Sequence, residues 1–190
     1  MRDPRKPYPT DYLLKYTILP LIPQWVTPNQ VTVLRIVLTP LAIWLIVVEN
    51  YRVAIPFFLF VALTDAIDGA MARMRNQITE WGTMWDPIAD KLFIGLAVFV
   101  IVLEHVNIFL GLLLLLVELI AVIGGYWRFR GGKVYPANVW GKIKMVLEVL
   151  GVTTLLVALA FQINLLVQLS FGTLALALVF AVMSLVTHTR

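Results

Sequence analysis

The sequence predicts an all-α integral membrane protein in which six transmembrane helices follow a short N-terminal helix at the membrane surface. Hydrophobic residues make up 61% of the 190 residues and charged residues only 14%, which is not the composition of a soluble domain. The apolar residues form six runs, and each run is close to the roughly 20 residues that a helix needs to cross a bilayer. The six runs are residues 31–48, 53–73, 83–103, 108–128, 139–161 and 165–187.

The positions of the basic residues predict the orientation of these spans. Six spans place the two termini and the loops after the second and fourth runs on the same side of the membrane. Every Lys and Arg except Arg52 lies on that side or within a few turns of it. Because cytoplasmic loops are rich in Lys and Arg, we expect this side to face the cytoplasm, in the cytoplasmic membrane. The net charge of +4 then indicates contact with anionic lipid head groups and phosphate rather than with nucleic acid.

The first 30 residues are expected to form a cytoplasmic segment ahead of a membrane domain that comprises residues 31–190. Residues 11–21 mix Leu and Ile with Tyr and charged residues, and this pattern suits an amphipathic helix in the interface plane. A disordered leader is the alternative. Further on, Thr27 and Pro28 predict the start of the first spanning helix, because Thr caps helices and Pro is tolerated in the first turn.

Four aspartates are the unusual feature of the predicted spans: Asp65 and Asp68 belong to the second run, and Asp86 and Asp90 to the third. At about 100° per residue, each pair lies on one face of its helix, beside small residues that allow two backbones to approach closely. A charge near the bilayer centre costs roughly 2.5–3.5 kcal/mol, so the four carboxylates require compensation. Carboxylate oxygens from two helices suit hard cations such as Mg²⁺ or Mn²⁺, and a sequence without Cys argues against zinc.

The aspartates could also have one of two different roles. In the first, the acids are solvated at the interface and pair with Arg73 and Lys91. In the second, they mark the ion path of a cation-coupled transporter, which is a different class of membrane protein. The transporter is disfavoured because the acids gather at one face and the two halves of the chain do not repeat one pattern. A metal site at a membrane face favours chemistry at phosphorus, because bound metals neutralise phosphate oxygens.

Residues 65–90 match the pattern D-x2-D-G-x2-A-R-x8-G-x3-D-x3-D. This pattern resembles, position for position, the signature of the CDP-alcohol phosphatidyltransferases, and the resemblance extends in outline to the six spans and the N-terminal helix. It implies a transferase of phospholipid biosynthesis that acts as a homodimer and uses CDP-diacylglycerol as donor. The hydroxyl of a polar alcohol would attack the lipid-linked phosphorus and release CMP.

The resemblance also implies roles for individual residues. Asp65, Asp68 and Asp86 would bind two divalent cations, Mg²⁺ or Mn²⁺. Asp90 would ligate the second cation and act as the general base on the acceptor hydroxyl. A further set of residues would contact the CDP part of the donor: Asn29, Thr32, Gly69, Arg73 and Thr79. The first two of these come from a looser match near the start of the first span, which continues to Arg35.

Two sequence elements bear on the acceptor. Pro87, directly after the third aspartate, resembles the phosphatidylglycerophosphate synthase and cardiolipin synthase branches of the family. The sequence G-K-I-K at residues 141–144 resembles an element of the glycerophosphate enzymes. We therefore expect sn-glycerol 3-phosphate as the acceptor, bound by Lys142, Lys144 and Arg128.

One departure from the glycerophosphate branch keeps other acceptors open. Those enzymes usually carry Arg-Glu in the fourth span and a further Arg about two turns later, whereas this chain has Val117 before Glu118 and glycines near the later position. Phosphatidylglycerol, as in a cardiolipin synthase, or another polar alcohol is therefore the alternative acceptor. Glu118 and Glu148 are intramembrane acids, which predicts either a functional role or a buried pair with Lys91 or Lys144.

Overall fold

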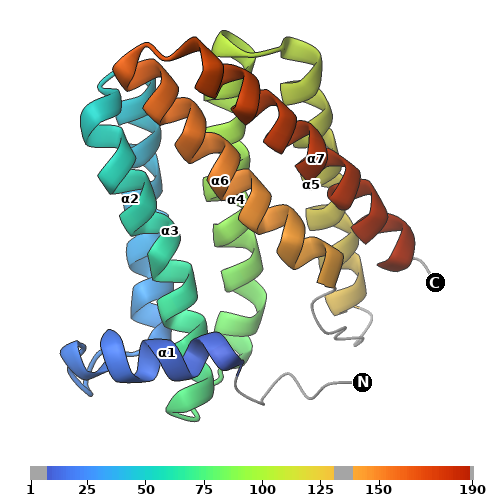
Figure 1. Cartoon of the computed structure of the whole chain (residues 1–190). Helices are drawn as coiled ribbons and strands as arrows, with labels where there is room; N and C mark the ends of the chain where they lie inside the picture. The colour runs from blue at the N-terminus through green and yellow to red at the C-terminus, as the bar shows by residue number, and fades with distance from the viewer. Residues whose placement is uncertain (1–7, 131–138, 189–190) are drawn as a thin grey trace.

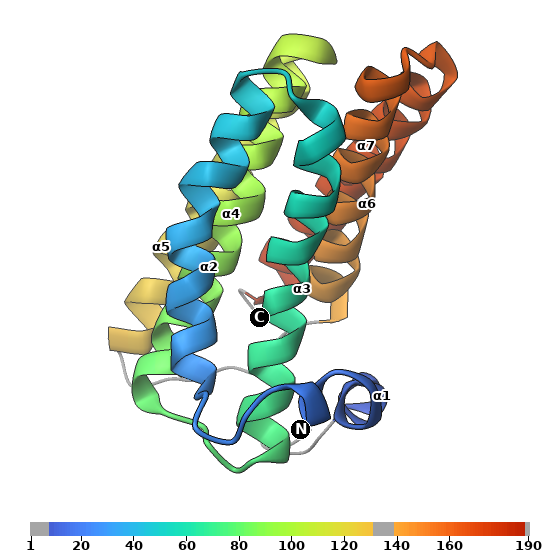
Figure 2. The same ribbon diagram turned by 90° about the vertical axis from the view of Figure 1, so that its left-hand side faces the viewer.

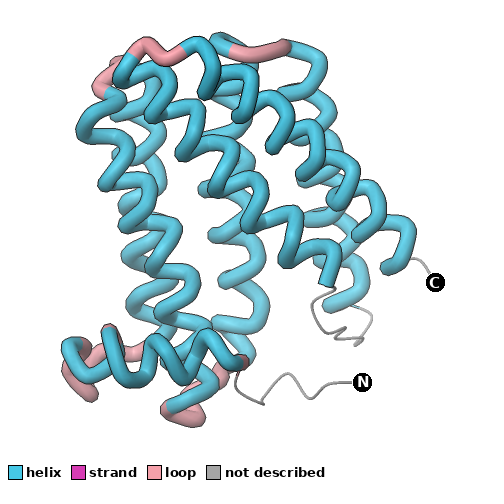
Figure 3. Tube along the Cα trace, in the orientation of Figure 1, coloured by secondary structure: helices cyan, strands magenta, loops and turns pink. Residues whose placement is uncertain are grey.

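A computed structural model describes residues 8–130 and 139–188 of the chain, and in these residues it contains only helices and connecting loops (Figure 3). A short helix, α1 (Pro9–Thr17), and a 3-10 turn, η1 (Leu19–Leu21), precede the long helices. The long helices are α2 (Pro28–Val47), α3 (Tyr51–Met74), α4 (Glu80–His105), α5 (Ile108–Arg130), α6 (Val139–Phe161) and α7 (Asn164–His188). Each predicted apolar run coincides with one of these helices, so the all-helical prediction is confirmed.

Among the described helices, four are long and apolar enough to cross a membrane: α2, α3, α6 and α7. In α5 the apolar stretch is shorter, Ile108–Gly124, and α4 carries Asp86, Asp90 and Lys91 in its first half. This is the architecture of an integral membrane protein. The full set of six spans and the interfacial position of α1 stay predictions.

The long helices run side by side, and α1 lies across one end of them (Figures 1 and 2). Helix α2 packs against α3 and α4, α4 also packs against α5, and α6 packs against α3 and α7. The core between them includes Phe58 and Phe93, whose ring centroids are 4.9 Å apart. Helices α6 and α7 approach closely at Gly151, where a Cβ atom would lie 2.7 Å from the Leu174 side chain. The hydroxyl of Ser170 donates to the Gly151 carbonyl at 2.8 Å and ties the same two helices together.

Local capping sets where two of the helices begin. Thr27 caps α2: its Oγ1 accepts from the Gln30 N–H at 3.4 Å, and its own N–H donates to Gln30 Oε1 at 2.9 Å. Pro28 occupies the first turn, as predicted from the sequence. Thr79 caps α4 by accepting from the Gly82 N–H at 3.0 Å. These caps fix the register of the polar residues that follow in both helices.

The segment between α1 and α2 is attached to the end of α3. Arg75, just after α3, donates to the backbone carbonyls of Ile22 at 2.8 Å and Val26 at 3.1 Å. Beside it, a small cluster of buried side chains joins the segment to α2 and α3: Leu19, Val31, Ile67, Ala70 and Met71. These contacts hold α1 against the end of the bundle where the aspartates lie.

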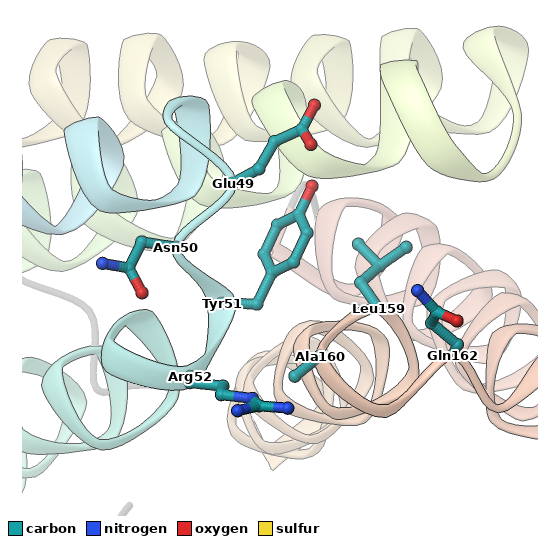
Figure 4. Close-up of a pocket in the computed structure, with 7 residues that line it drawn as sticks. All are labelled: Glu49, Asn50, Tyr51, Arg52, Leu159, Ala160 and Gln162. Atoms are coloured by element: carbon teal, nitrogen blue, oxygen red, sulfur yellow. The ribbon is translucent and has the colours of Figure 1, made fainter.

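The opposite end of the bundle carries a hollow of about 310 Å³. The connections α2–α3 and α6–α7 form it, and its lining residues are Glu49, Asn50, Tyr51, Arg52, Leu159, Ala160 and Gln162 (Figure 4). Arg52 is the basic residue that the sequence assigns to the side away from the aspartates. None of the predicted site residues lines this hollow, so the candidate site lies at the α1 end.

Candidate active site

The bundle end that α1 crosses contains the C-terminal part of α3 and the N-terminal part of α4 (Figure 2). Each of these parts carries one pair of aspartates, spaced three or four residues apart and therefore on one face of its helix. Helix α2 packs against both helices and contributes Thr32 and Arg35 to the same place. We call the four aspartates with these two residues the acid cluster.

Arg35 is the counter-ion of the α3 aspartates. Its side chain is 0% exposed; Nη1 donates to Asp65 Oδ1 at 2.7 Å, and Nη2 donates to Asp68. A planar guanidinium can bind two carboxylates at once because its donors point in fixed directions. The sequence prediction placed Arg35 only near the nucleotide element and missed this ion pair. The available signal was a charge inside the apolar run of α2, which requires an opposite charge nearby.

Thr32 links the acids of two helices. Its Oγ1 lies 2.7 Å from Asp86 Oδ1 and 3.0 Å from Asp68 Oδ2. A hydroxyl has one hydrogen to donate, so Thr32 donates to one of these carboxylates at a time. The two distances show that a carboxylate of α3 and a carboxylate of α4 reach the same point.

Asp90 is the aspartate that connects the acid cluster with α6. It interacts electrostatically with Asp65 and Arg35, and also with Lys144 and Glu148 of α6. Its own charge acts on Arg35 together with those of the other three aspartates. Asp90 therefore interacts with charged residues that come from different parts of the bundle.

Two predicted nucleotide contacts, Asn29 and Thr79, lie together where α2 and α4 begin. Thr79 Oγ1 donates to Asn29 Oδ1 at 2.9 Å. A Cβ atom at Gly82 would lie 3.0 Å from Asn29 Oδ1 and 3.1 Å from Thr79 Oγ1, so this approach favours glycine. A hollow of about 330 Å³ adjoins the pair, lined by Asn29, Gln30, Val33 and Trp81.

Two further predicted nucleotide contacts, Gly69 and Arg73, meet one turn apart on α3. The Arg73 guanidinium lies over Gly69, where a Cβ atom would be 3.2 Å from Nη2. Arg73 also forms an ion pair with Asp11 of α1, which the sequence prediction missed. Burial alone would raise the pKa of Asp11, but hydrogen bonds from Arg73 and from the Tyr8 N–H outweigh it and hold that pKa below its ordinary value of 3.8. Asp11 is therefore charged at neutral pH.

A second charged group lies between α5 and α6. Lys144 pairs with Glu118 of α5 and, at 3.3 Å, with Glu148 one turn further along α6. Of the two sequence interpretations of these glutamates, the structure shows the buried pair with Lys144. Glu118 Oε2 is buried with no hydrogen-bond partner in the part of the chain that the structure describes. We call Lys144 and the two glutamates the lysine cluster.

Of the other two predicted acceptor contacts, one lies outside the lysine cluster and the other outside the described side chains. Lys142 points toward the start of α1, where its Nζ lies 3.5 Å from the centroid of the Tyr8 ring. Arg128 belongs to the last turns of α5, and its side chain lies outside the described residues. Of the two acceptor residues whose side chains the structure describes, Lys144 interacts electrostatically with Asp90, and Lys142 lies beside Tyr8.

The sequence profile of the CDP-alcohol phosphatidyltransferases matches residues 25–186, which include the whole acid cluster. The chain belongs to the CDP-alcohol phosphatidyltransferase family. It is an enzyme that transfers a substituted phosphate group, and it serves phospholipid biosynthesis. The family assignment made from residues 65–90 is confirmed.

Relatives from two branches of the phosphatidyltransferases are similar to this chain. A CDP-diacylglycerol–glycerol-3-phosphate 3-phosphatidyltransferase of Pseudomonas fluorescens is 33% identical over 138 residues, which are 68% of this chain and 71% of the relative. The enzyme of that name from Aquifex aeolicus (strain VF5) is 28% identical over 165 residues, 85% of this chain and 93% of the relative. The cardiolipin synthase (CMP-forming) of Homo sapiens is 38% identical over 73 residues, 38% of this chain and 24% of the relative.

Phosphatidyltransferases of this family generally depend on a divalent metal, and the acid cluster suits such an ion chemically. The charges of four aspartates act on one guanidinium, so negative charge exceeds positive charge. Carboxylate oxygens are the ligands that Mg²⁺ and Mn²⁺ prefer. Within residues 8–130 and 139–188, however, no three Asp, Glu or His side chains are arranged as a metal site. Asp65 and Asp68 instead pair with Arg35.

Proposed function

We propose that this phosphatidyltransferase transfers the phosphatidyl group of CDP-diacylglycerol to sn-glycerol 3-phosphate and releases CMP. The observation that carries the proposal is the acid cluster, in which aspartates from α3 and α4 meet at one end of a bundle of apolar helices. The names of the relatives from Pseudomonas fluorescens and Aquifex aeolicus support this choice of donor and acceptor.

The aspartates would hold two divalent cations, Mg²⁺ or Mn²⁺: Asp65, Asp68, Asp86 and Asp90. When bound, such cations offset the charge of the donor diphosphate and of the departing CMP. The contribution of the chain itself is to fix the carboxylates in place. Arg35 orients the two aspartates of α3, and Thr32 bridges them to α4.

Asp90 would accept the proton of the acceptor hydroxyl. As the hydroxyl oxygen forms its bond to the phosphatidyl phosphorus, the bond from this phosphorus to the bridging oxygen of CMP breaks and CMP leaves. The proton passes to a carboxylate oxygen of Asp90. Asp90 interacts electrostatically both with Asp65 and Arg35 and with Lys144 and Glu148, which supports this role, because the donor phosphate would belong with the acid cluster and the acceptor with the lysine cluster.

The donor would bind along α3 and the start of α2. Arg73 would pair with the diphosphate, because a guanidinium matches phosphate oxygens through two hydrogen bonds. Gly69 would let the nucleotide approach the α3 backbone. Asn29, Thr32 and Thr79 would contact the rest of the CDP group beside the hollow between α2 and α4, and the acyl chains would lie between helices.

The acceptor phosphate would be bound by Lys142, Lys144 and Arg128. One observation favours a second candidate function, transfer to phosphatidylglycerol as in a cardiolipin synthase. Lys144 is already paired with two glutamates, and a lysine neutralised in this way is a weaker anchor for a free phosphate group. Val117 also stands where the glycerophosphate branch usually has Arg. The similarity to the human cardiolipin synthase supports the same alternative.

The proposal includes an arrangement in the membrane. Helices α2–α7 would all cross the cytoplasmic membrane, with the acid cluster at the cytoplasmic face, and the enzyme would be a homodimer. Helix α1 would lie in the interface, where its exposed Leu13 and Tyr16 and the nearby Trp25 would contact lipid. Because the chain has no Cys, single Cys residues at the exposed positions Gln24 and Asn50 can report the two faces. A membrane-impermeant thiol reagent applied to intact cells should label the Asn50→Cys variant but not the Gln24→Cys variant.

The decisive experiment is CMP release by the purified protein in detergent with Mg²⁺ or Mn²⁺. CDP-diacylglycerol is supplied with sn-glycerol 3-phosphate, with phosphatidylglycerol, or with a panel of other polar alcohols. Release that requires sn-glycerol 3-phosphate supports the main proposal, whereas release that requires phosphatidylglycerol selects the alternative. No CMP release with any alcohol would reject both.

A further inference from the structure

Asp11 joins the N-terminal helix to a residue of the proposed donor site. Its carboxylate accepts two hydrogen bonds from Arg73, one from Nε to Oδ2 at 2.7 Å and one from Nη2 to Oδ1 at 2.9 Å. The Asp11 side chain is only 2% exposed, although α1 lies at the edge of the bundle (Figure 1). An ion pair with two parallel hydrogen bonds fixes the plane of a guanidinium as well as its position.

Other groups hold the Arg73 guanidinium from different sides. It lies over Gly69, where a Cβ atom would be 3.2 Å from Nη2 and 3.3 Å from Nη1. Its Cζ lies 4.9 Å from the centroid of the Tyr8 ring. The ion pair with Asp11 uses Nε and Nη2, and among residues 8–130 and 139–188 no hydrogen bond uses Nη1, so we infer that this edge of the guanidinium can receive a second anion.

The position of the Asp11 carboxylate is itself determined by backbone contacts. Its Oδ2 accepts from the Tyr8 N–H at 2.7 Å in the first turn of α1. The chain after α1 is held by the hydrogen bonds from Arg75 to the carbonyls of Ile22 and Val26. Asp11 is therefore oriented by the first turn of α1, in a segment whose later part is attached to the end of α3.

We propose that Asp11 is a positioning residue for the donor: it holds Arg73 so that the Nη1 edge of the guanidinium meets the diphosphate of CDP-diacylglycerol. The inference rests on the proposed function, in which Arg73 binds this diphosphate. Fixing a mobile arginine side chain lowers its conformational entropy. Because Asp11 already fixes Arg73 in the folded protein, binding of the donor does not have to lower that entropy further. Asp11 thereby sets the affinity for the donor and leaves the affinity for the acceptor unchanged.

The test is a double-mutant cycle in which CMP release gives the KM for the donor and for the acceptor. Asp11→Asn removes the charge but keeps an oxygen for the Tyr8 N–H, and we expect it to raise the donor KM roughly tenfold. Asp11→Glu restores the carboxylate and should recover most of this loss. Arg73→Lys should raise the donor KM by itself. Adding Asp11→Asn to Arg73→Lys should then have little further effect, because an ammonium group has no plane to orient.

The matched control is Glu104→Gln, which converts an exposed carboxylate to an amide. Glu104 lies at the C-terminal end of α4, away from Asp86 and Asp90, so both KM values should stay unchanged. A donor KM that falls in Asp11→Asn would overturn the inference, because Asp11 would then compete with the donor for Arg73. An unchanged donor KM in this variant, or an equal rise in both KM values, would also overturn it.

The same cycle separates the failure of this inference from a failure of the proposed donor site. A raised donor KM in Arg73→Lys together with an unchanged one in Asp11→Asn rejects the inference alone. An unchanged donor KM in Arg73→Lys removes Arg73 from the donor site, and the role of Asp11 falls with it.

Discussion

The acid cluster and the lysine cluster both place one basic side chain between two carboxylates, but they differ in the charge that surrounds this arrangement. Arg35 pairs with two aspartates of α3, and the charges of Asp86 and Asp90 act on it as well. Lys144 pairs with two glutamates, one from α5 and one from its own helix. The acid cluster therefore has the larger excess of negative charge. Because buried charge without compensation is costly, this cluster is the one that calls for additional cations.

The clusters also differ in which helices they join. The guanidinium of Arg35 reaches from α2 to the face of α3, and Thr32 extends the contact to α4. Lys144 joins α5 to α6 and interacts electrostatically with Asp90 of the acid cluster. The proposed metal chemistry therefore depends on residues of α2–α4, whereas α5 and α6 carry a more nearly neutral group of charges beside them.

The largest effect is expected from removing the carboxylate charge of Asp90 in the acid cluster. Asp90→Asn should lower kcat by roughly 10²–10⁴-fold, because the amide cannot accept the proton of the acceptor hydroxyl. Donor binding, measured as the rise in Tm with CDP-diacylglycerol, should be largely retained. Glu148→Gln is the matched variant in the lysine cluster and should retain far more of the turnover. Normal turnover in Asp90→Asn would remove Asp90 as the base, and equal losses in both variants would erase the distinction between the clusters.

The next effect concerns stability and its dependence on Mg²⁺. Arg35→Met leaves buried carboxylates unpaired and should lower the free energy of unfolding by about 3–5 kcal/mol. Mg²⁺ should restore part of this loss, because a cation takes over the compensation of the aspartates. Lys144→Met should also destabilise the protein, but with no recovery in Mg²⁺ beyond that of the wild type. Thermal unfolding of each variant in detergent, with Mg²⁺ or with EDTA, measures the loss of stability and its recovery. A recovery that is the same in the two variants would contradict the assignment of the cation to the acid cluster.

A smaller effect is expected for the acceptor. Lys142 is exposed and lies outside both clusters, with its Nζ 3.5 Å from the centroid of the Tyr8 ring. Lys142→Ala should raise the KM for a phosphorylated acceptor roughly tenfold, the usual order of one charge-assisted contact, and leave the donor KM unchanged. Steady-state CMP release with each substrate varied in turn provides the measurement. If the acceptor KM does not change, Lys142 is not an acceptor contact.

The smallest effect is a dependence of the stability of α1 on pH, through the ion pair of Asp11 with Arg73. The Arg73 hydrogen bonds lower the pKa of Asp11 below 3.8 despite its burial. A group whose pKa is depressed in the folded state stabilises that state above its unfolded pKa, and the contribution is lost as the pH falls through the folded value. Hydrogen exchange of the α1 amides, corrected for the intrinsic rate, should therefore increase below about pH 3.8 in the wild type. In Asp11→Asn this increase in exchange should be absent. If the increase persists in that variant, a titrating group other than Asp11 causes it.

Most of the fold is predictable from local patterns. The six apolar runs match α2–α7 closely, because the length of a run and its hydrophobicity are properties of neighbouring residues. The start of α2 at Pro28 follows from the Thr27 cap, which is also a local contact. The pairing of aspartates on one face of each helix needs only the helical period. The signature of residues 65–90 then leads to the family.

The partners of the charged groups were decided by the tertiary structure. Arg35 meets Asp65 across 30 residues of sequence, and Arg73 meets Asp11 across 62. The pairing of these charges depends on how α1 and α2 are rotated and placed against α3. The spacing of residues within each helix does not predict that rotation. The sequence by itself determined the helices, their caps and the faces that carry acids, since these follow from contacts within a few turns. Only the packed bundle decided which basic side chain each acid meets, because the cost of burying a charge depends on how all the helices pack together.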